Sequence, residues 1–137
     1  MEVLYTAIAT SIGGRNGHVQ SADGVLDLEV KPPKEMGGPG GAYTNPEQLF
    51  AAGYSACFGS ALNHVALLKK KRIDPKVTAK VSIGKKPDGG FMLAVEMDVN
   101  IPGMDTKEAE ELMNEAHQVC PYSNATRNNI EVKLKLV

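Results

Sequence analysis

The chain contains several stretches typical of half-buried strands, in which every second residue is apolar or strand-forming residues predominate. These patterns predict strands at residues 3–11, 18–22, 26–30, 77–83, 91–101 and 130–136. Turn signals separate them, namely Asn16-Gly17 and Asp23-Gly24 in the first half and Pro87-Asp88-Gly89-Gly90 in the second. Strands joined by such short turns run antiparallel, so we expect antiparallel sheets.

A different pattern, apolar or small on nearly every face, runs from Asn45 to Leu68 and predicts a long helix. Asn45 can cap the free amide groups at its start, Pro46 suits the first helical position, and Gln48 is a capping-box partner. Because so few polar side chains remain for solvent, we expect this helix to be buried. A second helix begins after Asp105 and ends near Cys120, just before Pro121.

The order of strands, helix, strands, helix and strand predicts an α+β fold with antiparallel sheets packed on the long buried central helix. The length of 137 residues suits a single domain spanning residues 1–137. One small domain has difficulty covering an apolar helix on every side, whereas a second copy of the chain could cover the remainder. We therefore expect a homodimer.

The charge and hydropathy of the chain argue against several classes of function. The 15 basic and 16 acidic residues are interspersed, which argues against binding nucleic acid or an anionic membrane surface. No apolar run approaches membrane-spanning length and the first residues lack a signal-peptide pattern, so we expect a cytoplasmic protein with small-molecule or protein partners. The loop at residues 37–41 is rich in glycine, but it lacks the Lys-Ser/Thr ending of a nucleotide-binding P-loop.

The two cysteines, Cys57 and Cys120, are the first candidates for chemistry. In a cytosolic chain they indicate a catalytic, redox-sensing or metal-binding role more than a structural disulfide. A free thiol is only about 3% ionised at pH 7, and burial lowers that fraction, so a reactive Cys57 needs a nearby cation. Arg15, flanked by glycines in a turn, could supply it, and Glu47 could hold Arg15 in place. On the residues alone, the favoured interpretation makes Arg15 a solvated turn residue, Glu47 a helix-start acid and Cys57 a small buried hydrophobic residue.

Two other interpretations remain open on the residues alone. Cys57 with His64, and His117 with Cys120, form two helix-face pairs that a tetrahedral zinc ion could join. A redox-sensing module would use the same thiols but would need a partner surface or a DNA-binding element, and the chain has no basic recognition helix.

Residues 45–58 and 119–127 resemble the two cysteine motifs of the organic hydroperoxide resistance proteins, the Ohr branch of the Ohr/OsmC superfamily. The resemblance extends to residues 5–7, 13–17, 23–28 and 37–41, and so covers essentially the whole chain. The OsmC branch is the nearest alternative, but the Cys120 segment and the early position of Arg15 are more similar to Ohr. Asn128 departs from the family pattern, which has Gly there, although Asn also tolerates positive φ.

The resemblance implies an OsmC-like fold in an intertwined homodimer with active sites at the subunit interface. It implies a thiol-dependent peroxidase that reduces alkyl and fatty-acid hydroperoxides to alcohols. Cys57 would become a sulfenic acid, and Cys120 would resolve it as a Cys57–Cys120 disulfide. Arg15 would stabilise the thiolate and the departing oxygen, with Glu47 orienting it.

The resemblance also implies that no metal or flavin cofactor is needed. Dihydrolipoyl groups on a lipoylated protein would reduce the disulfide, so a lipoyl-bearing partner is expected. An apolar pocket around Cys57, to which Phe50 or Met36 contributes, would favour bulky hydroperoxides over hydrogen peroxide.

Overall fold

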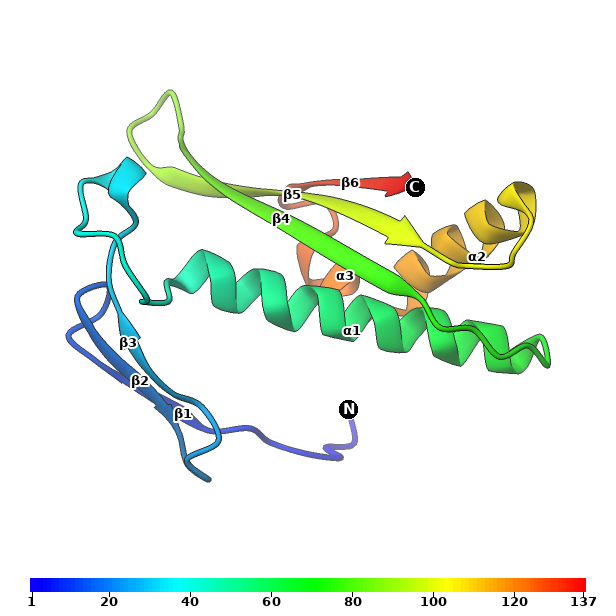
Figure 1. Ribbon diagram of the computed structural model, residues 1–137, viewed down its shortest axis with the longest axis horizontal. Helices are drawn as coiled ribbons and strands as arrows, with labels where there is room; N and C mark the ends of the chain where they lie inside the picture. The colour runs from blue at the N-terminus through cyan, green and yellow to red at the C-terminus, as the bar shows by residue number, and fades with distance from the viewer. The chain divides into compact units, whose positions relative to one another are not determined.

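The computed structural model describes all of residues 1–137, which form two compact units, residues 1–49 and residues 50–137 (Figure 1). The single domain expected over the whole chain stays a prediction. None of the helices combines the length and the hydropathy needed to cross a bilayer.

The first unit is built on a three-stranded antiparallel sheet of β1 (Ala9–Ile12), β2 (Gly17–Ser21) and β3 (Asp27–Val30). The turn between β1 and β2 is formed by residues 13–16, so it begins before the expected Asn16-Gly17 pair. Gly13 and Gly14 adopt positive φ angles of 77° and 57°, and the Asn16 N–H donates to the Gly13 carbonyl over 3.1 Å. Gly17 belongs to β2, where a Cβ would stand 1.9 Å from the Ile12 carbonyl oxygen, so the position requires glycine.

The predicted strand at residues 3–11 was too long at its start, since β1 begins only at Ala9. Ala9 pairs with Ser21, the last residue of β2, and one hydrogen bond, from the Ala22 N–H to the Ile8 carbonyl, continues the pairing beyond it. Four apolar side chains in that segment are exposed, those of Val3, Leu4, Tyr5 and Ile8. After β3, a short 3-10 helix, η1 (Lys34–Met36), and a glycine-containing loop lead to α1 (Pro46–Leu68).

The start of α1 follows its sequence signals. The Asn45 side chain accepts a hydrogen bond from the Gln48 N–H at 2.9 Å, as the cap requires. The Gln48 side chain accepts a hydrogen bond from the Thr44 hydroxyl at 3.2 Å, so it serves the residue before the cap. The Asp105 cap of α2 is likewise confirmed, because its carboxylate accepts from the Glu108 N–H.

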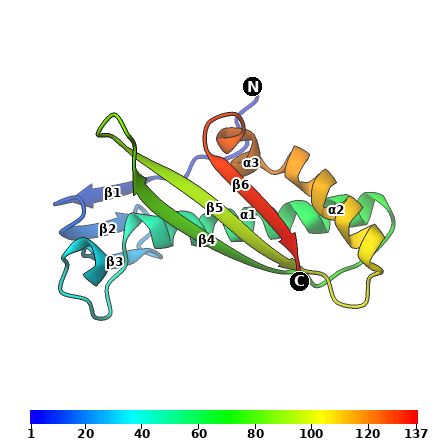
Figure 2. The same cartoon turned by 90° about the horizontal axis from the view of Figure 1, so that it is seen from above.

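The second unit combines the greater part of α1 with β4 (Lys76–Lys85), β5 (Phe91–Asn100), α2 (Thr106–Val119), α3 (Pro121–Thr126) and β6 (Glu131–Leu136). β4 and β5 form the expected antiparallel hairpin. β6 pairs with β5 in parallel, with Val95 opposite Val132, so the expectation of purely antiparallel sheets was wrong and this sheet is mixed. The reason is that α2 and α3 carry the chain back along the sheet before β6 begins (Figure 2).

The core of the second unit lies between one face of α1, the β4–β5–β6 sheet and α2 (Figure 1). Its largest fully buried side chains include Tyr54, Phe58 and Leu62 of α1, Met97 of β5 and Leu112 of α2. The opposite side of α1 exposes a row of mostly small residues, Ala52, Ala56, Ser60, Asn63 and Leu67. The second unit therefore buries one face of α1, and complete burial of this helix stays a prediction that depends on a second copy.

Asn128 adopts a left-handed conformation, with φ at 62°, in the turn that leads to β6. Asn tolerates this conformation better than Ala, whereas Gly tolerates it best. We expect Asn128→Ala to lower the free energy of unfolding by about 1 kcal/mol and Asn128→Gly to change it by less than about 0.5 kcal/mol. Urea unfolding followed by circular dichroism measures both, and equal stability of the two variants would contradict this explanation.

Candidate functional site

The structure brings the two cysteines together within the second unit. Cys57 lies half-buried in the middle of α1, and Cys120 is fully buried at the corner between α2 and α3. Both thiols are free, and their Sγ atoms are 3.6 Å apart. Cys120 is held by backbone hydrogen bonds on both sides, since its N–H donates to Ala116 and its carbonyl accepts from Asn124, each over 2.9 Å. A modest approach of the two sulfur atoms would allow a covalent bond between them.

The environment of Cys57 disfavours its thiolate. Burial is the main cause that raises the pKa of the Cys57 thiol, and the neighbouring Cys120 raises it further. The backbone N–H of Tyr122 opposes these effects by hydrogen bonding to the sulfur. With these neighbours alone Cys57 is a neutral thiol at pH 7, so rapid nucleophilic chemistry requires a further source of positive charge.

Arg15 and Glu47 form a two-pronged ion pair within the first unit. Arg15 Nη1 lies 2.8 Å from Glu47 Oε2, and Nη2 lies 2.6 Å from Oε1. Arg15 stands in the turn between β1 and β2, and Glu47 stands in the first turn of α1. The Arg15 hydrogen bonds lower the pKa of Glu47, and Glu47 raises the pKa of Arg15, so both stay charged around neutral pH. The Glu47 side chain is only 12% exposed whereas Arg15 is 39% exposed, so Glu47 is the better-fixed partner.

This pair gives a prediction for acid stability. Because the pKa of Glu47 is lowered in the folded chain, its contribution is present above its unfolded pKa of about 4.3 and is lost as the pH falls through the lower folded value. Glu47→Gln should therefore destabilise the protein by no more than about 1 kcal/mol at pH 7, since Arg15 is partly exposed. The difference in the free energy of unfolding between Glu47→Gln and the native protein should become smaller toward pH 3. Urea unfolding at the two pH values tests this, and a difference that persists unchanged at pH 3 would contradict it.

The ligand pairs of the zinc interpretation are not assembled. His64 is exposed on α1, and His117 directs Nδ1 at the Ser123 hydroxyl over 2.9 Å. Nowhere in residues 1–137 do three or more His, Cys, Asp or Glu side chains gather in a way that could hold a metal ion. The spacing of Cys57, His64, His117 and Cys120 therefore does not create a tetrahedral donor set in this structure.

A mainly apolar pocket of 440 Å³ lies in the second unit and has Phe50 in its lining. Leu93, Tyr122 and Ile130 contribute apolar surface to the same pocket. The Phe50 and Tyr122 rings are 6.1 Å apart, centre to centre. Cys57 is not among the residues that line this pocket, so the expected apolar pocket around Cys57 stays a prediction. Met36, the other residue expected to contribute to it, lies in η1 in the first unit.

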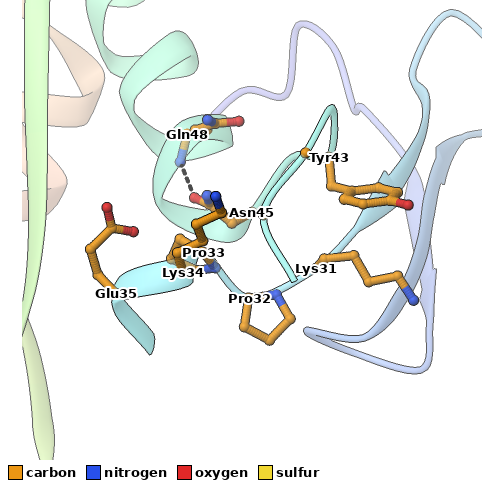
Figure 3. A pocket seen from close by; sticks show the side chains of 10 residues that line it. Lys31, Pro32, Pro33, Lys34, Glu35, Tyr43, Asn45 and Gln48 are labelled. Atoms are coloured by element: carbon orange, nitrogen blue, oxygen red, sulfur yellow. Dashed lines mark hydrogen bonds between the residues drawn. The ribbon is translucent and has the colours of Figure 1, made fainter. Parts of the chain in front are cut away.

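A smaller pocket of 220 Å³ lies in the first unit beside the start of α1 (Figure 3). Lys31, Lys34, Asn45 and Gln48 are among its lining residues. Figure 3 shows the Asn45 side chain turned toward the Gln48 N–H, so its oxygen already serves the helix cap. No buried side-chain polar atom of the chain lacks a hydrogen-bond partner, so no unpaired buried group marks this pocket as a ligand site.

The sequence did not reveal a cluster of buried hydroxyl groups beside Cys120. The Tyr54 hydroxyl lies 2.9 Å from the Ser123 hydroxyl and 3.1 Å from that of Thr126. His117 completes the cluster through Ser123. The one sequence signal that could have indicated this cluster is residue spacing. Ser123 and Thr126 are three residues apart and lie on one face of α3, and Tyr54 lies one turn before Cys57.

Comparison with known proteins extends over almost the whole chain. The OsmC-like protein family model matches residues 38–135. The organic hydroperoxide resistance protein of Xanthomonas axonopodis pv. citri is 53% identical over 98% of this chain and 96% of its own length. A crystal structure of an organic hydroperoxide resistance protein from Elizabethkingia anophelis matches with a TM-score of 0.94 and 59% identity, covering 99% of this chain and 98% of its own.

A further structure, described as an organic hydroperoxide resistance protein of Vibrio cholerae with captopril bound in one of the active sites, has a TM-score of 0.94 and 47% identity. It covers 99% of this chain and 94% of its own. The resemblance found in the cysteine motifs is thus confirmed over the full length. The chain belongs to the OsmC-like family and, within it, to the organic hydroperoxide resistance proteins.

Proposed function

We propose that the protein confers resistance to organic hydroperoxides as a thiol-dependent peroxidase that reduces them to alcohols. The observation that carries the proposal is the pair of free thiols, Cys57 and Cys120, held 3.6 Å apart in a chain about half identical to organic hydroperoxide resistance proteins. Two thiols at this distance can together give up two electrons and two protons and form a disulfide.

In the first step, the Cys57 thiolate attacks the terminal oxygen of the hydroperoxide. A sulfur–oxygen bond forms, the oxygen–oxygen bond breaks, and the alkoxide leaves and takes up a proton to become the alcohol. Cys57 is left as a sulfenic acid. In the second step, the Cys120 sulfur attacks Cys57 and releases the oxygen as water, which leaves the Cys57–Cys120 disulfide.

Arg15 is the cation that we assign to the first step. Its guanidinium would stabilise the Cys57 thiolate and the negative charge that develops on the leaving oxygen. Support comes from the raised pKa of Cys57, which calls for such a charge, and from the two hydrogen bonds by which Glu47 orients the guanidinium. The proposal requires the guanidinium to lie beside the Cys57 thiol in the reacting complex.

The reductant is proposed to be a dihydrolipoyl group on a lipoylated partner protein. Its two thiols would reduce the disulfide by exchange, which regenerates Cys57 and Cys120 and leaves the lipoyl group as its cyclic disulfide. No metal or flavin takes part in this cycle. The apolar pocket lined by Phe50 and Tyr122 offers a surface for the alkyl part of a bulky hydroperoxide.

We also propose that the working form is an intertwined homodimer. The exposed row of small residues on α1 and the exposed apolar side chains at residues 3–8 are surfaces that a second copy could cover. The Vibrio cholerae relative is described as having more than one active site, which fits an oligomer. Sedimentation equilibrium should give twice the chain mass, and a monomer at micromolar concentration would contradict this part of the proposal.

Turnover with defined reagents tests the proposed function. The reduced protein is mixed with cumene hydroperoxide and dihydrolipoamide, and the alcohol is quantified by chromatography. We expect catalytic formation of the alcohol, slower consumption of hydrogen peroxide, and little turnover when glutathione replaces the dithiol. Alcohol formation no faster than in the absence of protein would contradict the proposal.

A further inference from the structure

We propose that a buried chain of hydrogen bonds, running from His117 through Ser123 and Tyr54 to Thr126, positions Cys120 for its attack on Cys57. This inference rests on the proposed function and concerns only its second step. None of these side chains is hydrogen-bonded to either sulfur atom, so their role is to position Cys120. Thr126 also lines the apolar pocket assigned to the alkyl part of the substrate.

The chain ties the elements on both sides of Cys120 to the helix that carries Cys57. His117 lies one turn before Cys120 in α2, and Ser123 lies one turn after it in α3. Tyr54 lies one turn before Cys57 in α1. α1 therefore meets the corner between α2 and α3 at two neighbouring points, the sulfur pair at 3.6 Å and the Tyr54–Ser123 hydroxyl pair at 2.9 Å.

The acceptors fix one direction for the hydrogens along this chain. The Thr126 hydroxyl lies 3.0 Å from the Tyr122 carbonyl and 3.2 Å from the Ser123 carbonyl, which can only accept, so Thr126 donates to this pair of carbonyls. Thr126 then accepts from Tyr54, Tyr54 accepts from Ser123, and Ser123 accepts from His117 Nδ1–H. Each hydroxyl donates once and accepts once, so the network is fully satisfied.

The state of His117 agrees with this direction. Burial, together with the positive charge of Arg127, lowers the pKa of His117, so the ring is neutral at pH 7 and carries a single N–H, which the hydrogen-bond direction above assigns to Nδ1. Arg127 also donates to the His117 carbonyl at 2.5 Å, which closes the corner between α2 and α3 from the other side.

Close packing leaves α3 little freedom to compensate for a lost hydrogen bond. A Cβ on Gly53 would stand 2.9 Å from the Tyr122 hydroxyl, so the Tyr122 side chain of α3 packs closely against the glycine of α1. The Tyr122 ring lies against that of Tyr54, with centres 5.6 Å apart. Tyr54 and Ser123 are completely buried, and hydroxyl groups without partners are costly there, so this arrangement of α3 is strongly preferred.

The second step is the one that depends on this arrangement. A sulfur–sulfur bond of about 2.05 Å must form from a separation of 3.6 Å, while the sulfenic oxygen leaves as water with the Cys120 proton. Reaction rates are sensitive to displacements of about 1 Å in the reacting groups. The first step uses the Cys57 sulfur, the hydroperoxide and the Arg15 guanidinium, none of which belongs to the network, so this step should not depend on the network.

Tyr54→Phe removes the central hydroxyl and tests the inference. After one equivalent of tert-butyl hydroperoxide, quenched samples are analysed by mass spectrometry for sulfenic acid, trapped with dimedone, and for disulfide. We expect sulfenic acid formation within about twofold of the native rate and disulfide formation about tenfold slower, the scale of a small misplacement. Thr126→Val should slow the same step, and Thr126→Ser, which restores the hydroxyl, should recover it.

Val99→Ala is the matched control, because it truncates a fully buried core residue of β5 and removes no hydrogen bond. It should leave the ratio of the two rates unchanged. Disulfide formation at the native rate in both Tyr54→Phe and Thr126→Val, or equal slowing in Val99→Ala, would overturn the inference while the proposed function stands. A native protein whose thiols do not react with the hydroperoxide would instead overturn the proposed function, and the inference with it.

Discussion

Cys57→Ser is expected to abolish hydroperoxide reduction, whereas Cys120→Ser is expected to leave the first turnover intact. Only Cys57 supplies the attacking sulfur in the proposed reaction, and a serine hydroxyl is far less nucleophilic at pH 7. The rate of alcohol formation should fall by more than about a thousandfold, the scale found when an enzyme nucleophile is removed. Single-turnover alcohol formation, measured by rapid quench, gives this rate directly.

The Cys120→Ser variant separates the two thiols. Its Cys57 should react with the hydroperoxide and release one equivalent of alcohol, but the sulfenic acid should persist because the second sulfur is missing. Dimedone should label Cys57 in this variant and should label the native protein only weakly. Equal loss of the first turnover in both variants would show that the roles of the two cysteines have been assigned wrongly.

Arg15→Gln is expected to slow the first step by about 10²–10³-fold, the effect of removing one donor to a developing oxyanion. The substitution should also shift the pH dependence of sulfenic acid formation toward higher pH. Without the cation the pKa of Cys57 rises, so the rate of sulfenic acid formation should continue to increase with pH where the native rate has already levelled off. A stopped-flow series from pH 5 to 10 with tert-butyl hydroperoxide measures both effects.

Three variants give this prediction its controls. Arg15→Lys keeps the charge but loses the planar guanidinium that donates two hydrogen bonds to Glu47. Its rate should therefore lie between those of the native protein and Arg15→Gln. Glu47→Gln should slow the step less than Arg15→Gln, because the guanidinium remains. Arg72→Gln, an exposed arginine after α1, should have no effect. A native pH profile in Arg15→Gln would remove Arg15 from the mechanism.

The elements with local signals were predictable from the sequence. α1 begins where Asn45 and Pro46 indicate, and β5 follows the alternation of its apolar residues. The parallel pairing of β6 was not predictable, because strand direction depends on the path of α2 and α3 and not on any residue in β6. The start of β1 was misjudged because strand propensity says nothing about how far the partner strand extends.

Some residues of the candidate site were predictable from the sequence and others were not. Cys57 and Cys120 were identifiable as residues, and the resemblance anticipated that Glu47 holds Arg15, which the structure contains as an ion pair. Ser123 and Thr126 were unremarkable in the sequence, since hydroxyl residues after a proline are common in turns. Their importance comes from contacts with Tyr54 across 69 and 72 residues, and no local pattern encodes such contacts.

The central claim is that Cys57 and Cys120 form a two-thiol couple that an organic hydroperoxide oxidises. The most direct test is the intact mass of the fully reduced protein before and after one equivalent of an alkyl hydroperoxide, measured without added reductant. The proposal predicts the loss of one pair of hydrogen atoms from each chain and a peptide in which Cys57 is joined to Cys120. An unchanged mass with both thiols still open to alkylation would contradict it.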